Sequence, residues 1–169
     1  MMRAQENEGV RQAEFEDVER IFNLVKTYPD ELIARSVSDI VQNIDRFLVY
    51  DAGDDVNGVV SWQILPEIGL HRPSVEIKSL AVKRAYRKRG IGKSLVESAI
   101  CRIRELRPQQ IIALTFVPDF FLKLGFVRVE KKDLMHKIYI GCANCTKYDS
   151  PFTCPEIAVA LKVSEESRF

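Results

Sequence analysis

An alternating strand that leads through a basic, glycine-containing turn into a long amphipathic helix constrains the fold of this chain most. Residues 75–82 (VEIKSLAV) alternate as expected for a strand. Residues 90–106 carry apolar side chains at helical spacing, and Pro108 ends that helix. The turn between them, residues 83–93, holds six basic and no acidic residues. A strand, a turn and a helix in this order predict an α/β unit built around the turn.

The remaining periodicity predicts a mixed sheet with further helices. Strands are expected at residues 10–14, 46–51, 59–65, 110–116, 126–130 and 157–163, with a hairpin turn at Asp54–Gly58, and helices at 16–28, 36–43 and 119–124. We find no repeats, low-complexity tracts or linkers, so one domain is expected. Residues 1–8 read as a flexible leader.

Charge and hydropathy exclude several classes of protein. The 169 residues include 25 basic and 24 acidic ones, so the net charge is +1. Dedicated nucleic-acid binders and membrane-surface proteins depend on excess basic charge, so we expect neither partner. No apolar run reaches transmembrane length, and the polar start lacks a signal-peptide core. A cytoplasmic protein with reduced cysteines is therefore expected.

The basic turn has the chemistry of a phosphate cradle. The first-turn N–H groups of a helix have no internal partner and carry partial positive charge. Gly90 and Gly92 stand where the helix begins, so a phosphate could approach the main chain closely. A solvated basic turn is the alternative. The dinucleotide motif fails because Leu95 replaces its third glycine, and the phosphate-loop motif fails because Arg87 replaces its first.

Three segments resemble the motifs of one known superfamily. Arg87-x-x-Gly90-x-Gly92 resembles the acyl-CoA pyrophosphate loop of the GNAT N-acetyltransferases. Residues 76–82 resemble their central strand, and residues 120–126 (FFLKLGF) resemble their later helix–strand motif. The spacing of the three segments also suits that family.

The resemblance, which spans roughly residues 10–130, implies both fold and cofactor. The expected fold is α/β (α+β), with a GNAT-like mixed, mostly antiparallel central sheet flanked by helices on both faces. Residues 1–169 form a single N-acetyltransferase domain, in which 133–155 are a cysteine-rich loop region. Acetyl-CoA would bind through its pantetheine arm and its pyrophosphate. The implied residues are Leu80, Ala81 and Val82 for the arm, and Arg87, Lys88, Arg89, Gly90, Ile91, Gly92, Lys93 and Ser94 for the pyrophosphate.

Acetyl transfer to an amine needs a base, and Glu76 is the candidate. Strand alternation puts Glu76, Lys78 and Leu80 on one face, where the carboxylate could take a proton through water. The alternative is a surface glutamate paired with Lys78. The tyrosine that often serves as general acid in the family is replaced by Phe121, which leaves Tyr86, Tyr139, water or unaided thiolate departure.

The acceptor is suggested by a second resemblance. Arg35-Ser36 before a short helix, and the three-cysteine tail, resemble short stand-alone N-acetylglutamate synthases. This implies an acetyl-CoA-dependent amino-acid N-acetyltransferase acting on L-glutamate, a step of arginine biosynthesis. Carboxylates suit fixed cations, so Arg35 and Lys78 are the substrate-binding candidates and Arg46 is a weaker third. Arg35 and Lys78 also have ordinary structural readings, at a helix start and in a strand.

The cysteines form half of a zinc-site pattern. Cys142-x-x-Cys145 and Cys154 supply three ligands for a structural zinc, and His136 is a candidate fourth. Reduced thiols or an oxidised pair are the alternatives. Cys101 is expected to be packed within its helix.

Two other functions remain open at this point. A GNAT enzyme could act on another amine, such as a protein N-terminus, a lysine or a polyamine. The chain could also be a non-catalytic CoA-binding module, or use its basic turn on nucleic acid. The expected partner is a small amino-acid substrate, and a homodimer is left open.

Overall fold

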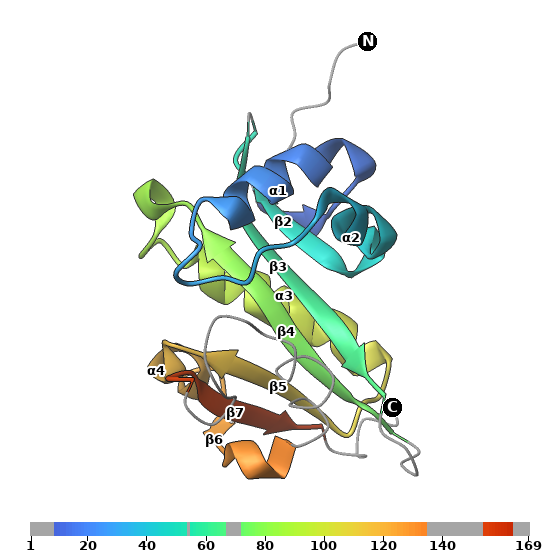
Figure 1. Ribbon diagram of the computed structural model, residues 1–169, viewed down its shortest axis with the longest axis vertical. Coiled ribbons are helices and arrows are strands. Elements are labelled where there is room, and N and C mark those ends of the chain that lie inside the picture. The colour runs from blue at the N-terminus through green and yellow to red at the C-terminus, as the bar shows by residue number, and fades with distance from the viewer. Residues whose placement is uncertain (1–8, 54, 67–71, 135–153, 164–169) are drawn as a thin grey trace. The chain divides into compact units, whose positions relative to one another are not determined.

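The computed structural model describes residues 9–53, 55–66, 72–134 and 154–163 (Figure 1). The predicted leader, Cys142, Cys145, His136 and Tyr139 lie outside these ranges. Within them, no helix is long and apolar enough to span a bilayer. The expected cytoplasmic location stays a prediction.

Helices and strands follow the predicted order along the chain. The strands are β1 (Gly9–Gln12), β2 (Phe47–Asp51), β3 (Val56–Leu65), β4 (Ser74–Val82), β5 (Gln110–Thr115), β6 (Val127–Arg128) and β7 (Ile157–Lys162). The α-helices are α1 (Val18–Lys26), α2 (Val37–Gln42), α3 (Ile91–Glu105) and α4 (Pro118–Leu122), with 3-10 turns at Phe15–Asp17, Ile44–Arg46, Arg84–Tyr86 and Lys131–Leu134.

The described strands form one mixed sheet in the order β1-β2-β3-β4-β5-β7-β6. The pairs β1/β2, β2/β3, β5/β7 and β6/β7 are antiparallel, whereas β4/β5 is parallel. A mixed, mostly antiparallel sheet was expected, and this prediction is confirmed. Because β7 lies between β5 and β6, the last strand of the sequence is not at the edge of the sheet (Figure 1).

Contacts divide the chain into two compact units. The first contains the residues up to Trp62 together with Ile77–Cys101, and the second contains Gln63–Glu76 and the residues from Arg102 onward. Consequently β3, β4 and α3 each contribute residues to both units.

The first unit is built on an apolar cluster beneath α1 and α2. The helical stripe predicted for α1 is buried, with Ile21 fully inaccessible to solvent. The cluster joins that stripe to Ile40 of α2 and to Phe47, Val49 and Val59 of the strands. Neighbouring strand residues point to opposite faces, so Gly58 faces the other side, where Leu95 and Ile91 of α3 lie. Figure 1 shows α1 and α2 in front of these strands and α3 behind them.

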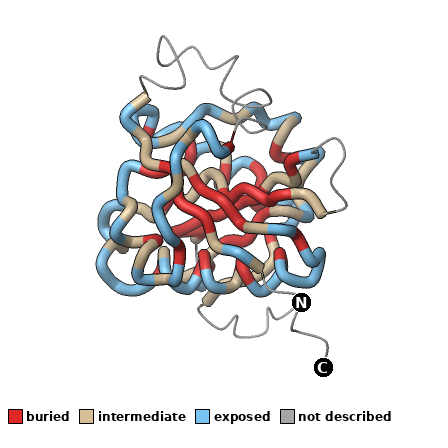
Figure 2. Tube along the Cα trace, turned by 90° about the horizontal axis from the view of Figure 1, so that it is seen from below, coloured by how far each residue is buried: buried red, intermediate tan, exposed pale blue. Residues whose placement is uncertain are grey.

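The second unit has its own smaller core. Leu65, Ile112, Leu134, Ala158 and Ala160 form a buried cluster around β5 and β7. Buried residues run along the central strands, and most of the exposed ones lie in helices and connections (Figure 2). The continuous apolar run predicted for β5 is explained by this burial.

One expectation from periodicity holds only in part, and another is wrong. Ser79 of β4 has a φ of +53°, an irregularity within the strand, so the predicted alternation of Glu76 and Lys78 cannot be carried on to Leu80. Cys101 is exposed rather than packed, because it lies on the solvent side of α3 next to the buried Ile100.

Candidate active site

The basic turn joins β4 to α3 with a geometry that opens its main chain to a ligand. After the 3-10 turn at Arg84–Tyr86, both Lys88 (φ +63°) and Gly90 (φ +80°) are in the left-handed region. Helix α3 then begins at Ile91, and the Ser94 N–H donates to the Gly90 carbonyl at 3.0 Å. The N–H groups before Ser94 therefore have no partner within the helix. An end of this kind suits an anion, and the phosphate binding expected from the sequence stays a prediction.

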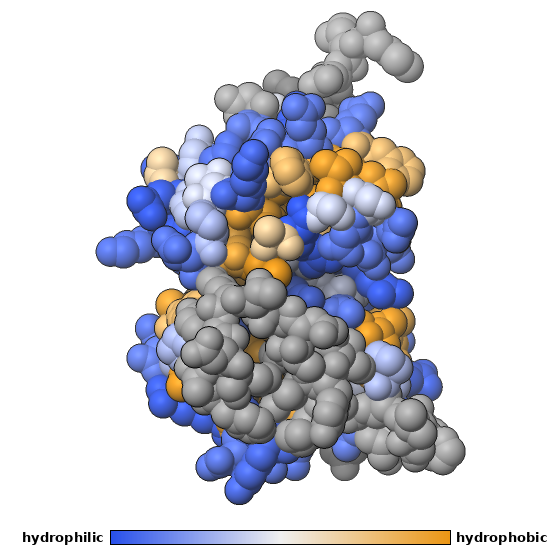
Figure 3. Space-filling model, in the orientation of Figure 1, coloured by the Kyte–Doolittle hydropathy of each residue, from blue (hydrophilic) through white to orange (hydrophobic). Residues whose placement is uncertain are grey.

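Most cations of the turn are at the surface. Lys88, Arg89 and Lys93 are exposed, and the Lys93 ammonium is 4.0 Å from the Glu97 carboxylate. Hydrophilic residues cover this side of the molecule, where the loop between β4 and α3 lies (Figure 3). Arg89 places its guanidinium 5.1 Å from the ring centroid of Tyr86, the residue we considered as a proton donor. That role of Tyr86 stays a prediction.

Arg87 is placed differently from its neighbours. Its Nε donates to the Val82 carbonyl at 2.9 Å, and its Nη2 pairs with Glu31 at 3.2 Å. Its guanidinium also lies 4.8 Å from the ring centroid of Tyr28. The side chain therefore contacts the end of β4 and the segment after α1, and its expected part in pyrophosphate binding stays a prediction.

Strand β4 pairs with β5 over only the first part of its length. Its register with β5 comprises only Val75↔Ile111 and Glu76↔Ile112 among the described residues. Leu80, Ala81 and Val82, the predicted pantetheine partners, lie beyond the end of that ladder. These residues also follow the irregularity at Ser79.

Glu76 is buried within β4. Only 4% of its surface is exposed, so the alternative of a surface glutamate is wrong. Burying a carboxylate costs free energy, and such groups concentrate where their chemistry is used. Lys78 is half-buried, and its main-chain carbonyl accepts a hydrogen bond from Ser61 Oγ at 3.2 Å.

Arg35 lies just before α2 and is surrounded by polar side chains that accept its hydrogen bonds. Its Nε donates to Asp39 Oδ2 at 2.7 Å, and its Nη1 lies 3.1 Å from both Ser61 Oγ and Ser79 Oγ. The guanidinium is 4.9 Å from the ring centroid of Phe47, and only 14% of the side chain is exposed. No described residue hydrogen-bonds its Nη2 atom. Arg35 thus has a structural role, and its expected role in substrate binding stays a prediction.

Phe121 has an ordinary packing role. It is 3% exposed, and its ring contacts Phe126 edge-on with 5.3 Å between centroids. A residue buried in this way, with no acidic proton, cannot serve as the general acid. The replacement seen in the sequence therefore leaves that proton to another group.

The cysteine tail is largely outside the described residues. Cys154 is described, and burial raises the pKa of its thiol, which also lies 3.7 Å from Glu156 Oε2. A raised thiol pKa disfavours the thiolate that binds zinc. Among the described residues no group of three or more histidine, cysteine or acidic side chains could hold a metal. Nothing here supports the zinc expectation.

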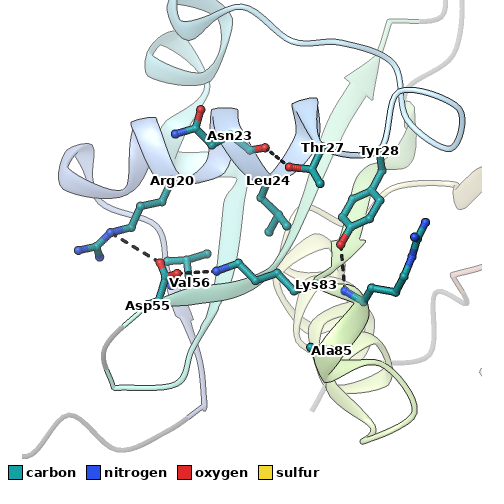
Figure 4. Close-up of a pocket in the computed structure, with 10 residues that line it drawn as sticks. Arg20, Asn23, Leu24, Thr27, Tyr28, Asp55, Val56, Lys83 and Ala85 are labelled. Atoms are coloured by element: carbon teal, nitrogen blue, oxygen red, sulfur yellow. Dashed lines mark hydrogen bonds and ion pairs between the residues drawn. The ribbon is translucent and has the colours of Figure 1, made fainter.

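A pocket of about 460 Å³ lies beside the basic turn, between α1 and the ends of β3 and β4 (Figure 4). Lys83 and Arg20 both point toward Asp55, which accepts their ion pairs. The Lys83 hydrogen bond is the largest cause that lowers the pKa of Asp55. Because Asp55 already pairs with Lys83 and Arg20, we assign no ligand to this pocket.

Several contacts could not be read from the sequence. Arg87 and Arg35 are held by residues 26 to 59 positions away in the sequence, namely Tyr28, Glu31, Ser61 and Ser79. No local pattern marks such partners. The nearest signal was the Arg-Ser pair at 35–36, where Ser36 does cap α2 by accepting the Asp39 N–H.

The mixed sheet and the basic turn at the start of α3 fit the fold of an acyl-CoA-dependent acetyltransferase. Residues 43–128 match the model of the GNAT acetyltransferase domain, and the chain belongs to that family. It is 33% identical over 153 residues to an uncharacterised N-acetyltransferase of Chlorobaculum tepidum, covering 89% of this chain and 93% of the relative. Like the family, it uses acetyl-CoA as its donor.

Other relatives bear on the acceptor. An amino-acid acetyltransferase of Mycobacterium tuberculosis is 29% identical over 141 residues, covering 83% of this chain and 79% of that protein. The structure of Rv2747 of Mycobacterium tuberculosis in complex with CoA superposes with a TM-score of 0.74 at 23% identity, covering 92% of this chain and 99% of that one. N-acetylglutamate synthase of Neisseria gonorrhoeae, complexed with coenzyme A and N-acetyl-glutamate, has a TM-score of 0.74 at 19% identity and covers 92% and 35% of the two chains. The last two likenesses confirm the fold.

Proposed function

We propose that this protein transfers the acetyl group of acetyl-CoA to the α-amine of an amino acid, with L-glutamate the first acceptor to test. The observation that carries the proposal is the amino-acid acetyltransferase of Mycobacterium tuberculosis, which aligns over 83% of this chain. The Arg-Ser pair at residues 35–36 supports it, because an arginine can bind the carboxylate that every amino acid carries.

In the proposed reaction the acceptor, an ammonium in solution, first loses a proton to Glu76 through a water molecule. The amine nitrogen then attacks the thioester carbonyl carbon, a C–N bond forms, and the C–S bond breaks. The new amide nitrogen releases its second proton to solvent, and the departing CoA thiolate takes up a proton from solvent. A thiol pKa of about 8.5 makes an unaided departure feasible, in keeping with a phenylalanine at position 121.

The donor would bind along β4 and the start of α3. The pantetheine arm would pair with the main chain of Leu80–Val82 as an added strand. The pyrophosphate would accept N–H bonds from residues 88–94, with the lysines and Arg89 adding attraction. The end of the β4/β5 register at Glu76 and the left-handed residues Lys88 and Gly90 support this placement.

The acceptor carboxylate would bind Nη2 of Arg35, with Lys78 as a second cation. Since Nε and Nη1 already donate within the protein, the contact would be to one guanidinium nitrogen rather than to a fork. Because two nitrogens of Arg35 are already bonded within the protein, a second candidate is a GNAT enzyme whose acceptor amine carries no carboxylate. Because Arg35 also joins β3 and β4 through Ser61 and Ser79, replacing it would disturb turnover of either acceptor, so a screen of acceptors separates the two candidates.

The deciding experiment follows CoA release with a thiol reagent while acetyl-CoA is mixed with each of the twenty amino acids. A product heavier by one acetyl group, identified by mass spectrometry, should appear with glutamate. Release with a polyamine or a peptide N-terminus, and with none of the amino acids, would overturn the proposal.

A further inference from the structure

The contacts of Arg87 connect the donor loop to the segment that follows α1. Its guanidinium donates to the last carbonyl of β4, Val82, and lies on the Tyr28 ring. One nitrogen continues to Glu31. All of these partners lie within the first unit.

Tyr28 anchors the same loop a second time. Its hydroxyl accepts the main-chain N–H of Arg84 at 2.9 Å, as the close-up shows (Figure 4). The ring is only 8% exposed, and the Arg84 guanidinium lies 5.7 Å from its centroid. One buried aromatic side chain thus fixes the main chain at residue 84 and the side chain at residue 87.

Glu31 reaches Arg87 because the turn after α1 is ordered by Tyr28 itself. The N–H groups of Glu31 and Leu32 both donate to the Tyr28 carbonyl, at 3.2 and 3.0 Å. The ring and the carboxylate are therefore presented by one turn. We call Tyr28, Glu31 and Arg87 the loop clamp.

We propose that the loop clamp positions the main chain of residues 84–90 for the pyrophosphate of acetyl-CoA. Arg87 acts through the loop and is a positioning residue. The proposal depends on the use of acetyl-CoA and not on the identity of the acceptor. A loop held in its binding conformation loses less conformational entropy when the donor arrives, so the clamp strengthens donor binding.

Direct binding of the pyrophosphate by Arg87 is the alternative, and it predicts the opposite change in CoA affinity when the Glu31 charge is removed. If Arg87 bound the pyrophosphate directly, its bond to Glu31 would compete with the donor, and removing the Glu31 charge would tighten CoA binding. If Arg87 positions the loop, removing that charge weakens CoA binding. A change at Arg87 alone weakens binding in both cases, so the decisive substitutions are at its partners.

The test measures the dissociation constant of CoA by calorimetry, which needs no acceptor, for Tyr28→Phe, Glu31→Gln and Arg87→Lys. We expect Tyr28→Phe and Glu31→Gln each to weaken CoA binding about three-fold, as fits one hydrogen bond and one half-exposed ion pair. Glu31→Gln combined with Arg87→Lys should weaken it by less than the product of the two single effects. Glu19→Gln, an exposed acid on α1, serves as the matched control and should leave it unchanged.

A second readout separates positioning from general stability. Acetyl-pantetheine lacks the pyrophosphate, so kcat/KM for this short donor should be the same in Tyr28→Phe, Glu31→Gln and the unaltered protein. It is measured with whichever acceptor the release assay identifies. Tighter CoA binding in Glu31→Gln, unchanged binding in both variants, or an equal loss with both donors would each overturn the proposal. A failure to find an amino-acid acceptor would leave the calorimetric result standing.

Discussion

Nη1 of Arg35 donates a hydrogen bond of 3.1 Å to Oγ of Ser79, the residue at which β4 has positive φ. The same nitrogen lies 3.1 Å from Ser61 Oγ on β3. One guanidinium thus joins two neighbouring strands at the point where β4 departs from regular geometry. This fixes the direction of the strand that leads to the predicted pantetheine partners.

Ser79→Val should therefore disturb both stability and donor binding. A β-branched residue at positive φ is strained, and the change also removes the hydroxyl, so we expect a loss of about 2–3 kcal/mol in unfolding free energy. Ser79→Gly loses the hydroxyl but accepts the backbone angle, and should cost about 1 kcal/mol or less. Urea unfolding of both variants gives the comparison. Equal losses would show that the backbone angle is unimportant.

Glu76→Gln tests the general base. The amide keeps the size of the buried side chain but cannot take the proton, so kcat should fall about 100-fold or more, within the range for general-base catalysis. The KM for acetyl-CoA should change little. Activity of the variant should rise with pH as more of the acceptor becomes the free amine. A kcat within three-fold of the unaltered enzyme would remove Glu76 from the reaction.

The absence of a side chain at Gly58 allows α3 to pack closely on the sheet. A Cβ at this position would lie 2.9 Å from Cδ1 of Leu95 and 3.2 Å from Cγ2 of Ile91, the first residue of the helix. We expect Gly58→Ala to cost about 1–2 kcal/mol and to raise the KM for acetyl-CoA, because the Leu95 and Ile91 side chains, or α3 with them, must shift. Leu95→Val removes the nearer atom. Together the two changes should cost less than their sum, as thermal unfolding would show.

Asp17 should make stability depend on acidity. Burial alone would raise the pKa of this carboxyl, but hydrogen bonds from Arg11 and from the Glu14 N–H hold it below its ordinary value of 3.8. The folded state thus favours the carboxylate. Its contribution is complete above the unfolded pKa and is lost as the pH falls through the lower folded one.

Asp17→Asn should therefore lower the free energy of unfolding by about 2 kcal/mol at pH 7, and by less at pH 3, where the unaltered protein has lost part of the same contribution. Denaturant unfolding at pH 7 and pH 3 measures the difference. Glu16→Gln, an exposed neighbour in the same turn, is the control. A loss that does not depend on pH would contradict the assignment.

The sequence predicted the elements well because their signals are local. The apolar stripe of α1, the capping Ser36 of α2 and the alternation of β4 each depend on neighbouring residues. The basic turn was likewise predicted as a helix start because glycines and missing N–H partners are local features. The register and the order of the strands had to come from the structure.

What sequence could not supply were contacts between distant segments. Arg87 was assigned to the pyrophosphate through the resemblance of its loop motif, and its contacts with Tyr28 and Glu31, more than fifty residues earlier, could not be predicted. Glu76 could have been a surface residue until both faces of β4 were seen to be covered. Cys101 shows the converse, since a helix position next to a buried one can still face solvent.

The position of β7 between β5 and β6 has a consequence for synthesis of the chain. Until Ile157–Lys162 leaves the ribosome, β5 has no partner along the side that β7 occupies, and β6 cannot join the sheet. During that interval the apolar strand QIIALT presents an open edge of the kind that pairs with other chains. Nascent or truncated chains that end before residue 157 should therefore aggregate more than the full chain. Chaperone binding during translation should reduce this aggregation.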